Sequence, residues 1–384
     1  MRIAVIGPAY PIRGGISHYT SIMVQNMRSR HNVLHISYRK QYPDFLYPGR
    51  TQLDDSKEPV IGECEPLLSF INPLSWTKAA RRACKFEPDI LVLTWVSPAL
   101  AVQFRLISWY VKQRSPRTSI IFLCHNVVQH ERRPFDSLLT RFAIKNGDHF
   151  IVHGIESRDK LLALEPGAAV TNIALPTFDF FASRIISRHQ ARCDLGLVPD
   201  AAVALYFGFV RPYKGLKHLI AAVPTVIKEV PEFHLLVVGE FWESRTMYER
   251  TLAANGIQGV VTIVDRYIRN EEVTRYFSAA DLIILPYISA TGSAIVQVAY
   301  GFRKPVLTTR VGGLPEVVEH GVTGYLVEPG DPWALAQAMI EFFKQGRSTE
   351  FARNIELTRS NFSWDSLVEA IEAVIADPVV LDTD

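Results

Sequence analysis

The stretch AVALYFGFVRPYKGLKHLI, residues 202–220, decides the fold. An apolar run typical of a buried strand enters a loop, and an amphipathic, helix-like run leaves it. A glycine stands at each end of the loop, Gly208 and Gly215, with two cations, Arg211 and Lys214, between them. A strand that passes through a short loop into a helix is the repeating unit of an α/β sheet. The two cations leave two interpretations open, a solvated turn and a site for an anion.

The same alternation of strand-like and helix-like runs extends along the whole chain. The strand-like runs are RIAVIG (2–7), NVLHIS (32–37), DILVLT (89–94), SIIFLC (119–124), HFIVH (149–153), AVALYFG (202–208), HLLVVG (234–239), VVTIVD (260–265), LIILPY (282–287) and PVLTT (305–309). Such Val/Ile/Leu-rich runs suit parallel strands buried on both faces, with helices as crossovers. Two βα series in one chain predict an α/β fold of two doubly wound, Rossmann-like domains. A single closed eight-fold barrel is the structural alternative.

The predicted domain boundary lies near NIALPTFDFF, residues 172–181. It divides the chain into an N-terminal domain, residues 1–175, and a C-terminal domain, residues 176–384. In an alternative assignment, the last helix of the chain packs back on the N-terminal domain. A chain of 384 residues is longer than one typical core supports, which agrees with two domains.

Composition narrows the class of protein. The chain is 48% apolar and 21% charged, which is typical of a globular protein. Its formal net charge of +2 lacks the basic excess expected of a general nucleic-acid binder, so no nucleic-acid partner is expected. The four cysteines are far apart in sequence, which predicts neither a disulfide framework nor a zinc site and favours a reduced, cytoplasmic compartment. The start, MRIAVIGPAY, shows no secretory signal.

Residues 90–111, ILVLTWVSPALAVQFRLISWYV, have about the length of a membrane span and one charge, Arg105. Pro98 separates this stretch into a β-rich run and a helix-like run. A buried strand followed by a covered helix is therefore the favoured interpretation over a membrane span.

Two further glycine-bearing loops follow predicted strands. GPAYPIRGGISHYT, residues 7–20, places Gly14 and Gly15 at a helix entrance, where free N–H groups favour an anion. It lacks the GxGxxG dinucleotide fingerprint, and by itself it also fits a plain turn. ISATGSAIVQVAYGFRKPVLTT, residues 288–309, again leads from a strand into a helix through small polar residues. Ligands of open α/β sheets collect at the carboxyl ends of strands, so the three loops are expected to face one crevice.

Several of these segments together resemble a known family. GFVRPYKGL (208–216) and LPYISATGSAIVQVAYGFRKPVLTTRVGGLPEVVEHGVTGYLVEPGDP (285–332) look like the C-terminal half of a group 1 glycosyltransferase, family 4. GGISHYT (14–20) and FLCHNVVQHE (122–131) extend the resemblance over nearly the whole chain. It implies a retaining enzyme with a nucleoside diphosphate sugar as donor. It also implies the GT-B fold, in which two Rossmann-like domains face each other across a cleft.

The resemblance also implies roles for individual residues. The donor diphosphate would be held by side chains and backbone N–H groups from both domains, and Tyr267, with Asp265 and Arg266, would lie near the nucleotide base. His125 would contact the donor sugar, and His130 and Glu131 are interpreted either as acceptor contacts or as exposed residues. The residues assigned to the diphosphate side of the donor site are Arg211, Lys214, Gly15, Gly208, Gly292 and Ser293.

One departure from the family pattern concerns the donor. Two glutamates usual in the family are replaced by Ser289 and Gln297. Gln297 retains an acceptor oxygen for the ribose hydroxyls but has no charge. Ser289 is also assigned to the donor site, but it cannot supply the usual carboxylate contact with the sugar, which leaves the sugar open.

The predicted reaction moves a sugar onto an acceptor hydroxyl while Arg211 and Lys214 stabilise the departing diphosphate. No metal motif is visible, and no cofactor beyond the donor is expected. The acceptor is expected to be a saccharide or a lipid-linked saccharide. NPLSWTKAARRACK, residues 72–85, suggests either a helix resting on an anionic membrane surface or a solvated helix face. Rival interpretations are a catalytically inactive nucleotide-sugar binder, and an epimerase or phosphorylase.

Overall fold

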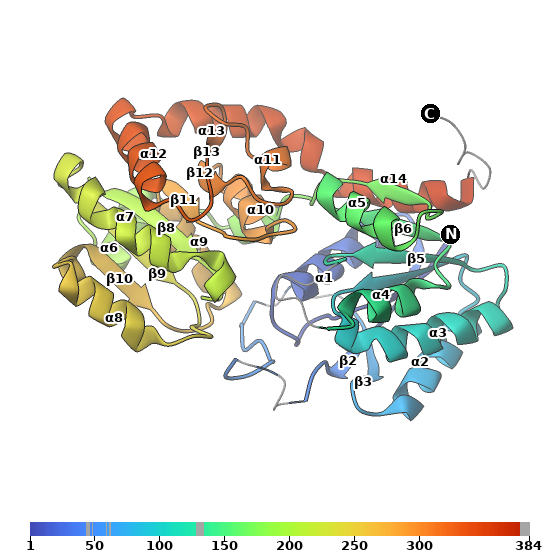
Figure 1. The fold of residues 1–384 in the computed structure, drawn as a ribbon. Helices are drawn as coiled ribbons and strands as arrows, with labels where there is room; N and C mark the ends of the chain where they lie inside the picture. Colours follow the sequence, from blue (N-terminus) through green and yellow to red (C-terminus); the bar gives the residue numbers. More distant parts are fainter. Residues whose placement is uncertain (44–46, 48, 59, 61–62, 128–133, 377–384) are drawn as a thin grey trace. The chain divides into compact units, whose positions relative to one another are not determined.

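The computed structural model describes residues 1–43, 47, 49–58, 60, 63–127 and 134–376. These residues form two compact units, which are described separately (Figure 1). Unit 1 comprises Met1–Asp55, Pro59–Ala174 and Ser363–Asp384, and unit 2 comprises Ser56–Glu58 and Leu175–Phe362.

Unit 1 contains a seven-stranded parallel sheet in the order β3-β2-β1-β4-β5-β6-β7. Its strands are β1 (Arg2–Ile6), β2 (Asn32–Lys40), β3 (Glu65–Ser69), β4 (Ile90–Trp95), β5 (Ser119–Cys124), β6 (His149–Val152) and β7 (Val170–Asn172). Its helices are α1 (Gly15–Arg28), α2 (Pro73–Lys85), α3 (Ala101–Arg114), α4 (Asp136–Ile144), α5 (Ile155–Leu164) and α14 (Trp364–Ala376). The chain moves from β1 outward to β3 and then returns to β4, so the loops after β1 and β4 diverge at a topological switch point.

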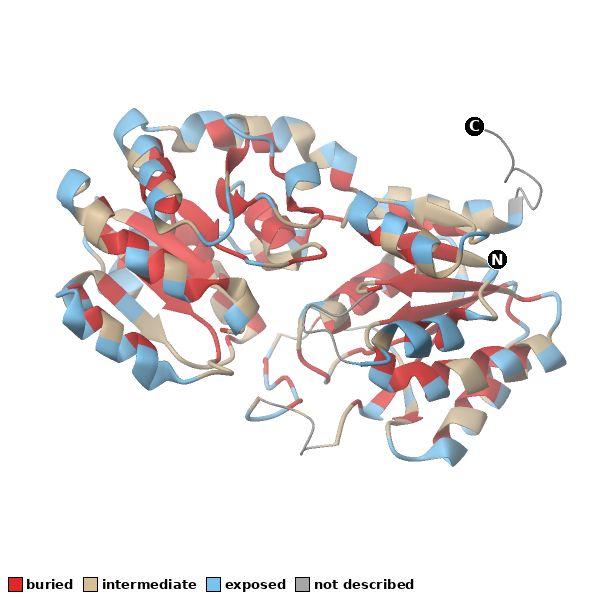
Figure 2. Ribbon diagram, in the orientation of Figure 1, coloured by how far each residue is buried: buried red, intermediate tan, exposed pale blue. Residues whose placement is uncertain are grey.

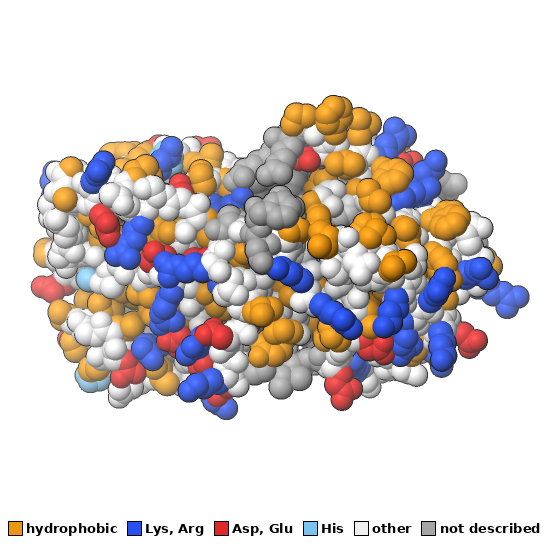
Figure 3. Space-filling view, turned by 90° about the horizontal axis from the view of Figure 1, so that it is seen from below, with side chains coloured by type: hydrophobic (Ala, Val, Ile, Leu, Met, Phe, Trp, Pro, Cys, Tyr) orange, Lys and Arg blue, Asp and Glu red, His pale blue; other side chains and the backbone are white. Residues whose placement is uncertain are grey.

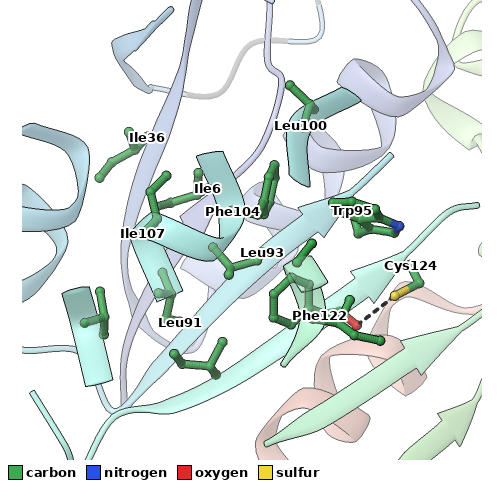
Figure 4. Packing of buried hydrophobic residues seen from close by; sticks show 14 of the residues in the cluster. Ile6, Ile36, Leu91, Leu93, Trp95, Leu100, Phe104, Ile107, Phe122 and Cys124 are labelled. Atoms are coloured by element: carbon green, nitrogen blue, oxygen red, sulfur yellow. Dashed lines mark hydrogen bonds between the residues drawn. The ribbon is translucent and has the colours of Figure 1, made fainter. Parts of the chain in front are cut away.

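The core of unit 1 lies between this sheet and the helices that cover it. Leu91, Leu93 and Trp95 alternate along β4 and pack against Phe104 and Ile107 of α3, as Figure 4 shows. All of these side chains are fully buried, and the central strands β1, β4, β5 and β6 are buried along nearly their whole length (Figure 2). Burying one such side chain contributes roughly 1.5–3 kcal/mol, which makes the hydrophobic effect the main stabilising term of this layer.

Unit 2 contains a six-stranded parallel sheet in the order β10-β9-β8-β11-β12-β13. Its strands are β8 (Ala202–Phe207), β9 (Phe233–Val238), β10 (Val261–Val264), β11 (Leu282–Leu285), β12 (Val306–Thr309) and β13 (Gly324–Val327). Its helices are α6 (Arg188–Asp194), α7 (Leu216–Glu229), α8 (Arg245–Ala254), α9 (Asn270–Ala279), α10 (Ala294–Gly301), α11 (Leu314–Val317), α12 (Pro332–Gln345) and α13 (Ser348–Thr358). The switch point lies between the neighbouring strands β8 and β11, so the loops after these two strands meet.

The structure confirms the predicted class of fold, with two parallel, doubly wound sheets in place of a closed barrel. Residues 90–111 form β4, a short 3₁₀ helix at Pro98–Leu100 and most of α3. No helix in the described part of the chain is long and apolar enough to cross a membrane. Where the sequence analysis assigned residues 176–384 to the second domain, the structure groups the segment from Ser363 onward with unit 1 and the short segment Ser56–Glu58 with unit 2.

Candidate functional site

In unit 2, the loop after β8 lies directly against the loop after β11. The Tyr213 carbonyl oxygen accepts a hydrogen bond of 2.7 Å from the Ile288 backbone N–H. Gly215 has φ 70°, and a Cβ atom there would lie 1.9 Å from the Pro286 carbonyl oxygen. Only glycine allows both this left-handed backbone and this close approach. The two loops that the sequence analysis assigned to the donor are therefore one continuous surface.

Lys214 places an uncompensated cation on this surface. Its Nζ lies 3.2 Å from where a Cβ of Gly208 would be, and 5.6 Å from the centre of the Tyr287 ring. Within the described part of the chain, Nζ has neither a hydrogen-bond acceptor nor an ion-pair partner. Burial and the nearby Arg211 guanidinium lower the pKa of Lys214 to about 8. A buried ammonium is costly unless an anion meets it.

Helix α10 begins beside the same ammonium. Ser293 caps the helix, since its Oγ accepts a hydrogen bond of 3.2 Å from the Ile295 N–H and lies 3.4 Å from the Tyr287 hydroxyl. The Ile295 side chain, like Lys214 Nζ, lies within 4 Å of the Cβ position of Gly208. Gly292 and Ser289 are half-buried in the loop that leads into the helix. The positive end of the helix dipole and Lys214 therefore favour an anion at one place.

Gln297, on the second turn of α10, has an unsatisfied side chain. It is 1% exposed, and neither Oε1 nor Nε2 has a hydrogen-bond partner among the residues that the structure describes. Leaving a buried amide without a partner costs roughly 1–3 kcal/mol, so such groups usually indicate a ligand or a water molecule. An amide can both donate to and accept from hydroxyl groups.

A row of aromatic side chains continues from the cationic loop. The Arg211 guanidinium lies 5.3 Å from the centre of the Trp242 ring, and that ring lies 4.4 Å from Phe209. The Phe209 ring is also stacked with Tyr267, with 6.3 Å between the two ring centres. Flat aromatic faces of this kind suit a nucleobase.

Asp265 and Arg266, which the sequence analysis placed near the base, are engaged within unit 2. Asp265 accepts a hydrogen bond of 3.0 Å from the Phe241 N–H. Arg266 forms a bidentate ion pair with Glu272, at 2.6 and 2.8 Å. Among Asp265, Arg266 and Tyr267, it is therefore Tyr267 that offers a ring face suited to a nucleobase.

In unit 1, Gly15 is the first residue of α1 and Gly14 precedes it with φ 116°. No side chain caps this helix, and a Cβ on Gly14 would have open space around it. The first N–H groups of α1 are thus left for water or for a ligand. The structure of unit 1 by itself is compatible with the predicted role of Gly15 toward an anion.

His125 directly follows β5 in unit 1. Its backbone N–H donates to the Trp95 carbonyl oxygen at 3.0 Å, and its ring meets Tyr19 edge-on at 4.6 Å between centres. The pKa of His125 is held well below its usual range, mainly by burial and to a lesser extent by the neighbouring His153. The imidazole is therefore neutral at pH 7, and it can exchange hydrogen bonds but supplies no charge.

His153 and Tyr19 were missed from the sequence. The ring of His153 lies 5.6 Å from that of His125, and its Nδ1 donates to the Ile173 carbonyl oxygen at 2.9 Å. Burial lowers the pKa of His153 to about 4, which leaves its Nε2 as an acceptor. Neither this Nε2 nor the Tyr19 hydroxyl has a partner among the described side chains and backbone groups. The sequence pattern could have indicated His153, because it directly follows strand β6 just as His125 directly follows strand β5.

Two other predictions have limited outcomes. His130 and Glu131 lie outside the described residues. Among the residues that the structure describes, no group of three or more His, Cys, Asp or Glu side chains could hold a metal ion.

Comparison with known proteins identifies related chains. Residues 201–345 match the family described as glycosyl transferases group 1. D-inositol 3-phosphate glycosyltransferase of Streptomyces coelicolor is 28% identical over 257 residues, which cover 60% of this chain and 53% of that protein. The protein of the same name from Corynebacterium efficiens is 28% identical over 233 residues, which cover 59% of this chain and 53% of that protein. The chain thus spans about half the length of the curated relatives it matches.

Solved structures share the fold over nearly the whole chain. Sucrose-phosphate synthase from Thermosynechococcus elongatus has a TM-score of 0.76 at 19% identity, and 98% of each chain is covered. HepE from Anabaena, solved in complex with UDP, has a TM-score of 0.73 at 18% identity, and 98% of this chain and 100% of that chain are covered. Another structure of HepE, in complex with UDP-glucose, has a TM-score of 0.72 at 18% identity, with 97% and 99% covered.

Proposed function

We propose, from the match of residues 201–345 to the family described as glycosyl transferases group 1, that the chain transfers a sugar from a nucleoside diphosphate sugar to an acceptor hydroxyl. The observation that carries the proposal is Lys214, a half-buried ammonium without a partner among the described residues, beside the first turn of α10. An anion is the ligand that removes the energetic cost of this arrangement.

The donor fits unit 2 part by part. The diphosphate lies between Lys214, Arg211 and the N–H groups of Gly292 and Ser293. The orphaned amide of Gln297 binds the ribose hydroxyls, and Tyr267 offers its face to the base. Because HepE was solved with UDP and with UDP-glucose, uridine nucleotides are the first donors to test.

The proposed chemistry follows from where negative charge develops. The anomeric C–O bond breaks, and the leaving diphosphate gains charge that Lys214 and Arg211 stabilise. A diphosphate oxygen takes the proton of the acceptor hydroxyl, which attacks from the same face and so retains the configuration. Neutral His125 positions a sugar hydroxyl by hydrogen bonding.

The acceptor and the setting are also part of the proposal. We take the acceptor to be a saccharide, free or linked to a lipid, and the process to be polysaccharide or glycolipid assembly in the cytoplasm. The four free cysteines support a reducing compartment.

A second candidate function rests on Ser289 and Gln297. Neither supplies the carboxylate usual at these positions, so the chain could bind a nucleotide sugar as a sensor without transferring it. Such a protein would bind UDP in a manner dependent on Lys214 and yet release none from UDP-glucose with any acceptor.

The test combines binding and turnover. Thermal unfolding is followed with UDP, GDP, ADP and CMP, where a ligand at a hundred times its Kd adds about 2.7 kcal/mol. UDP release from UDP-glucose is then measured with a panel of saccharide acceptors. Lys214→Gln should abolish the thermal shift and lower kcat by about 10²–10³-fold, the cost of losing one charge-stabilising group. The matched control is Lys217→Gln, three residues along the chain on an exposed side chain, which should change neither. If no nucleotide shifts the midpoint, the donor site is wrong.

A further inference from the structure

Three residues between β2 and β3, Ser56, Lys57 and Glu58, belong to unit 2, although the chain on either side of them belongs to unit 1. We call this tripeptide the strap. From Gln52 to Lys57 buried and exposed side chains alternate, which is the pattern of an extended chain, and Ser56 is 5% exposed. The polar groups of a buried, extended segment need hydrogen-bond partners. Those of the strap find them on helix α9.

The strap caps the first turn of α9. The backbone N–H of Asn270, the first residue of the helix, donates to Ser56 Oγ at 2.9 Å, and Asn270 Nδ2 donates to the Glu58 carbonyl oxygen at 3.1 Å. The Lys57 backbone N–H donates to the Glu271 carboxylate at 3.2 and 3.3 Å. The residue directly before the helix supplies no capping side chain. Ser56 therefore does, from a distant part of the sequence, what a local N-cap residue normally does.

The capped helix begins directly after the loop that carries Tyr267. This base loop, residues 265–269, joins the end of β10 to the start of α9. Arg266 ties the loop to the helix, because its bidentate ion pair is with Glu272 in the first turn of α9. Ile268, next to Tyr267, is buried. The orientation of the Tyr267 ring therefore depends on how well the first turn of α9 is held.

The buried hydrogen bonds of the strap matter more than its ion pair. Glu58 pairs with Arg184, but the two side chains are 40% and 72% exposed. Figure 3 shows Lys and Arg side chains next to Asp and Glu side chains at several places on one face of unit 2. Exposed pairs of this kind contribute little to stability, whereas a buried donor that loses its acceptor is costly. Any specific role of the strap therefore rests on Ser56 and Asn270, which are both 5% exposed.

We propose that Ser56 and Asn270 are positioning residues for the nucleobase of the donor, and that they act by holding the first turn of α9 and, through it, the base loop. This role rests on the donor site proposed above, with the base on Tyr267. Without the cap, the first turn frays and the base loop samples conformations that do not present the Tyr267 ring. The nucleotide must then order the loop as it binds, which lowers its affinity. The diphosphate contact at Lys214 lies on another loop and is unaffected.

Titration calorimetry of the full chain with UDP and with inorganic pyrophosphate, which has neither base nor ribose, tests the proposal. Ser56→Ala should raise the Kd for UDP about three- to tenfold, the factor that corresponds to the loss of a typical helix cap, and leave the Kd for pyrophosphate unchanged. Ser56→Thr should restore UDP affinity, because threonine also caps helices. The matched control is Lys57→Ala, which removes an exposed side chain and keeps the backbone N–H that contacts Glu271. It should bind both ligands like the wild type.

Hydrogen exchange of the ligand-free protein measures the base loop directly. In Ser56→Ala and in Asn270→Ala, the backbone amides of residues 265–272 should exchange faster than in the wild type, while circular dichroism shows that both variants are folded. The role is overturned if Ser56→Ala leaves UDP affinity or this exchange unchanged, or if it weakens UDP and pyrophosphate equally. Those results would leave the donor site intact. Failure of the wild type to bind any of UDP, GDP, ADP and CMP would instead remove the donor site, and the positioning role with it.

Discussion

Lys214 shows how a single residue can indicate a ligand before any is seen. A lysine at a protein surface is normally solvated or paired, but this one is half-buried beside Gly208 and Tyr287 and has no partner among the described residues. Desolvating the Lys214 ammonium without a counter-charge destabilises the fold, and a bound anion would offset this cost. Gln297 is a neutral counterpart, because its amide is buried and equally unsatisfied.

Nucleotide affinity should depend on pH through Lys214. Its pKa of about 8 in the folded protein lies below the value of about 10.4 for an unfolded chain. Between these values the unfolded state binds more protons than the folded state, so stability should rise with pH across this window. Diphosphate binding needs the charged ammonium, so UDP affinity should fall as pH rises above 8.

Titration calorimetry of UDP between pH 7 and about 9.5 checks this expectation, with buffers of different ionisation enthalpy to count the proton taken up. Lys214→Gln should lose both the proton uptake and the pH dependence. An unchanged pH profile in that variant would assign the titration to another group.

Gln297→Met should separate ligand binding from folding. Methionine fills a similar volume without polar atoms, so the unsatisfied amide disappears and stability should stay level or rise by about 1–3 kcal/mol. UDP binding should weaken about tenfold because the ribose loses its hydrogen bonds. Thermal unfolding and calorimetry measure the two effects, with Gln297→Glu as the companion variant that restores an acceptor. A loss of stability without a loss of affinity would show that the amide is structural.

At the scale of elements, the donor surface depends on two loops at neighbouring strand ends. β8 and β11 pair directly, so their loops begin side by side, and the hydrogen bond from Ile288 to Tyr213 ties the loops together. Gly215 permits this contact, because any side chain there would meet the Pro286 carbonyl oxygen. The position of Lys214 relative to α10 therefore depends on Gly215, which makes no contact with a ligand but lets the two loops approach each other.

Gly215→Ala should destabilise unit 2 by several kcal/mol and abolish the UDP-induced thermal shift. Gly256→Ala is the matched control, because Gly256 has φ 65° but open space at its Cβ. That substitution should cost only the left-handed backbone term of about 1–2 kcal/mol and leave UDP binding intact. Equal destabilisation by the two substitutions would mean that the contact with Pro286 is unimportant.

At the scale of the molecule, each unit is built from separated parts of the chain. Helix α14 comes after the last residue of unit 2, Phe362, in sequence, yet it packs on α1 and β5 of unit 1. Leu367 and Ile371 are fully buried there, Arg30 of unit 1 forms an ion pair with Asp365 of α14, and His31 is hydrogen-bonded to Glu372 of the same helix. Unit 1 therefore requires residues from both ends of the described chain.

Ile371→Ala should lower the stability of unit 1 by about 2–5 kcal/mol, the usual cost of a large-to-small change in a core. Differential scanning calorimetry with and without UDP identifies the transition of unit 2 as the one that the nucleotide shifts. The other transition should move in the variant, while the UDP-dependent one should stay in place. Leu357→Ala, on an exposed position of α13, is the control and should move neither. A single shared transition in the wild type would show that the units do not unfold separately.

The sequence alone predicted the two-domain α/β fold, most of its strands and the loops that carry Arg211 and Lys214, but it missed the strands β3, β7 and β13. These features depend on local patterns, because apolar runs, glycines and helix entrances act over a few residues. The resemblance to glycosyltransferases rests on the same short segments.

Only the tertiary structure decided which of these side chains are satisfied and which are exposed. It placed His153 beside His125, left the Gln297 amide without a partner among the described residues, and turned the apolar stripe of α4 outward. It also assigned α14 to unit 1. Burial and hydrogen bonding depend on residues far away in sequence, and a helical periodicity is the same whether its apolar face meets the core or the solvent.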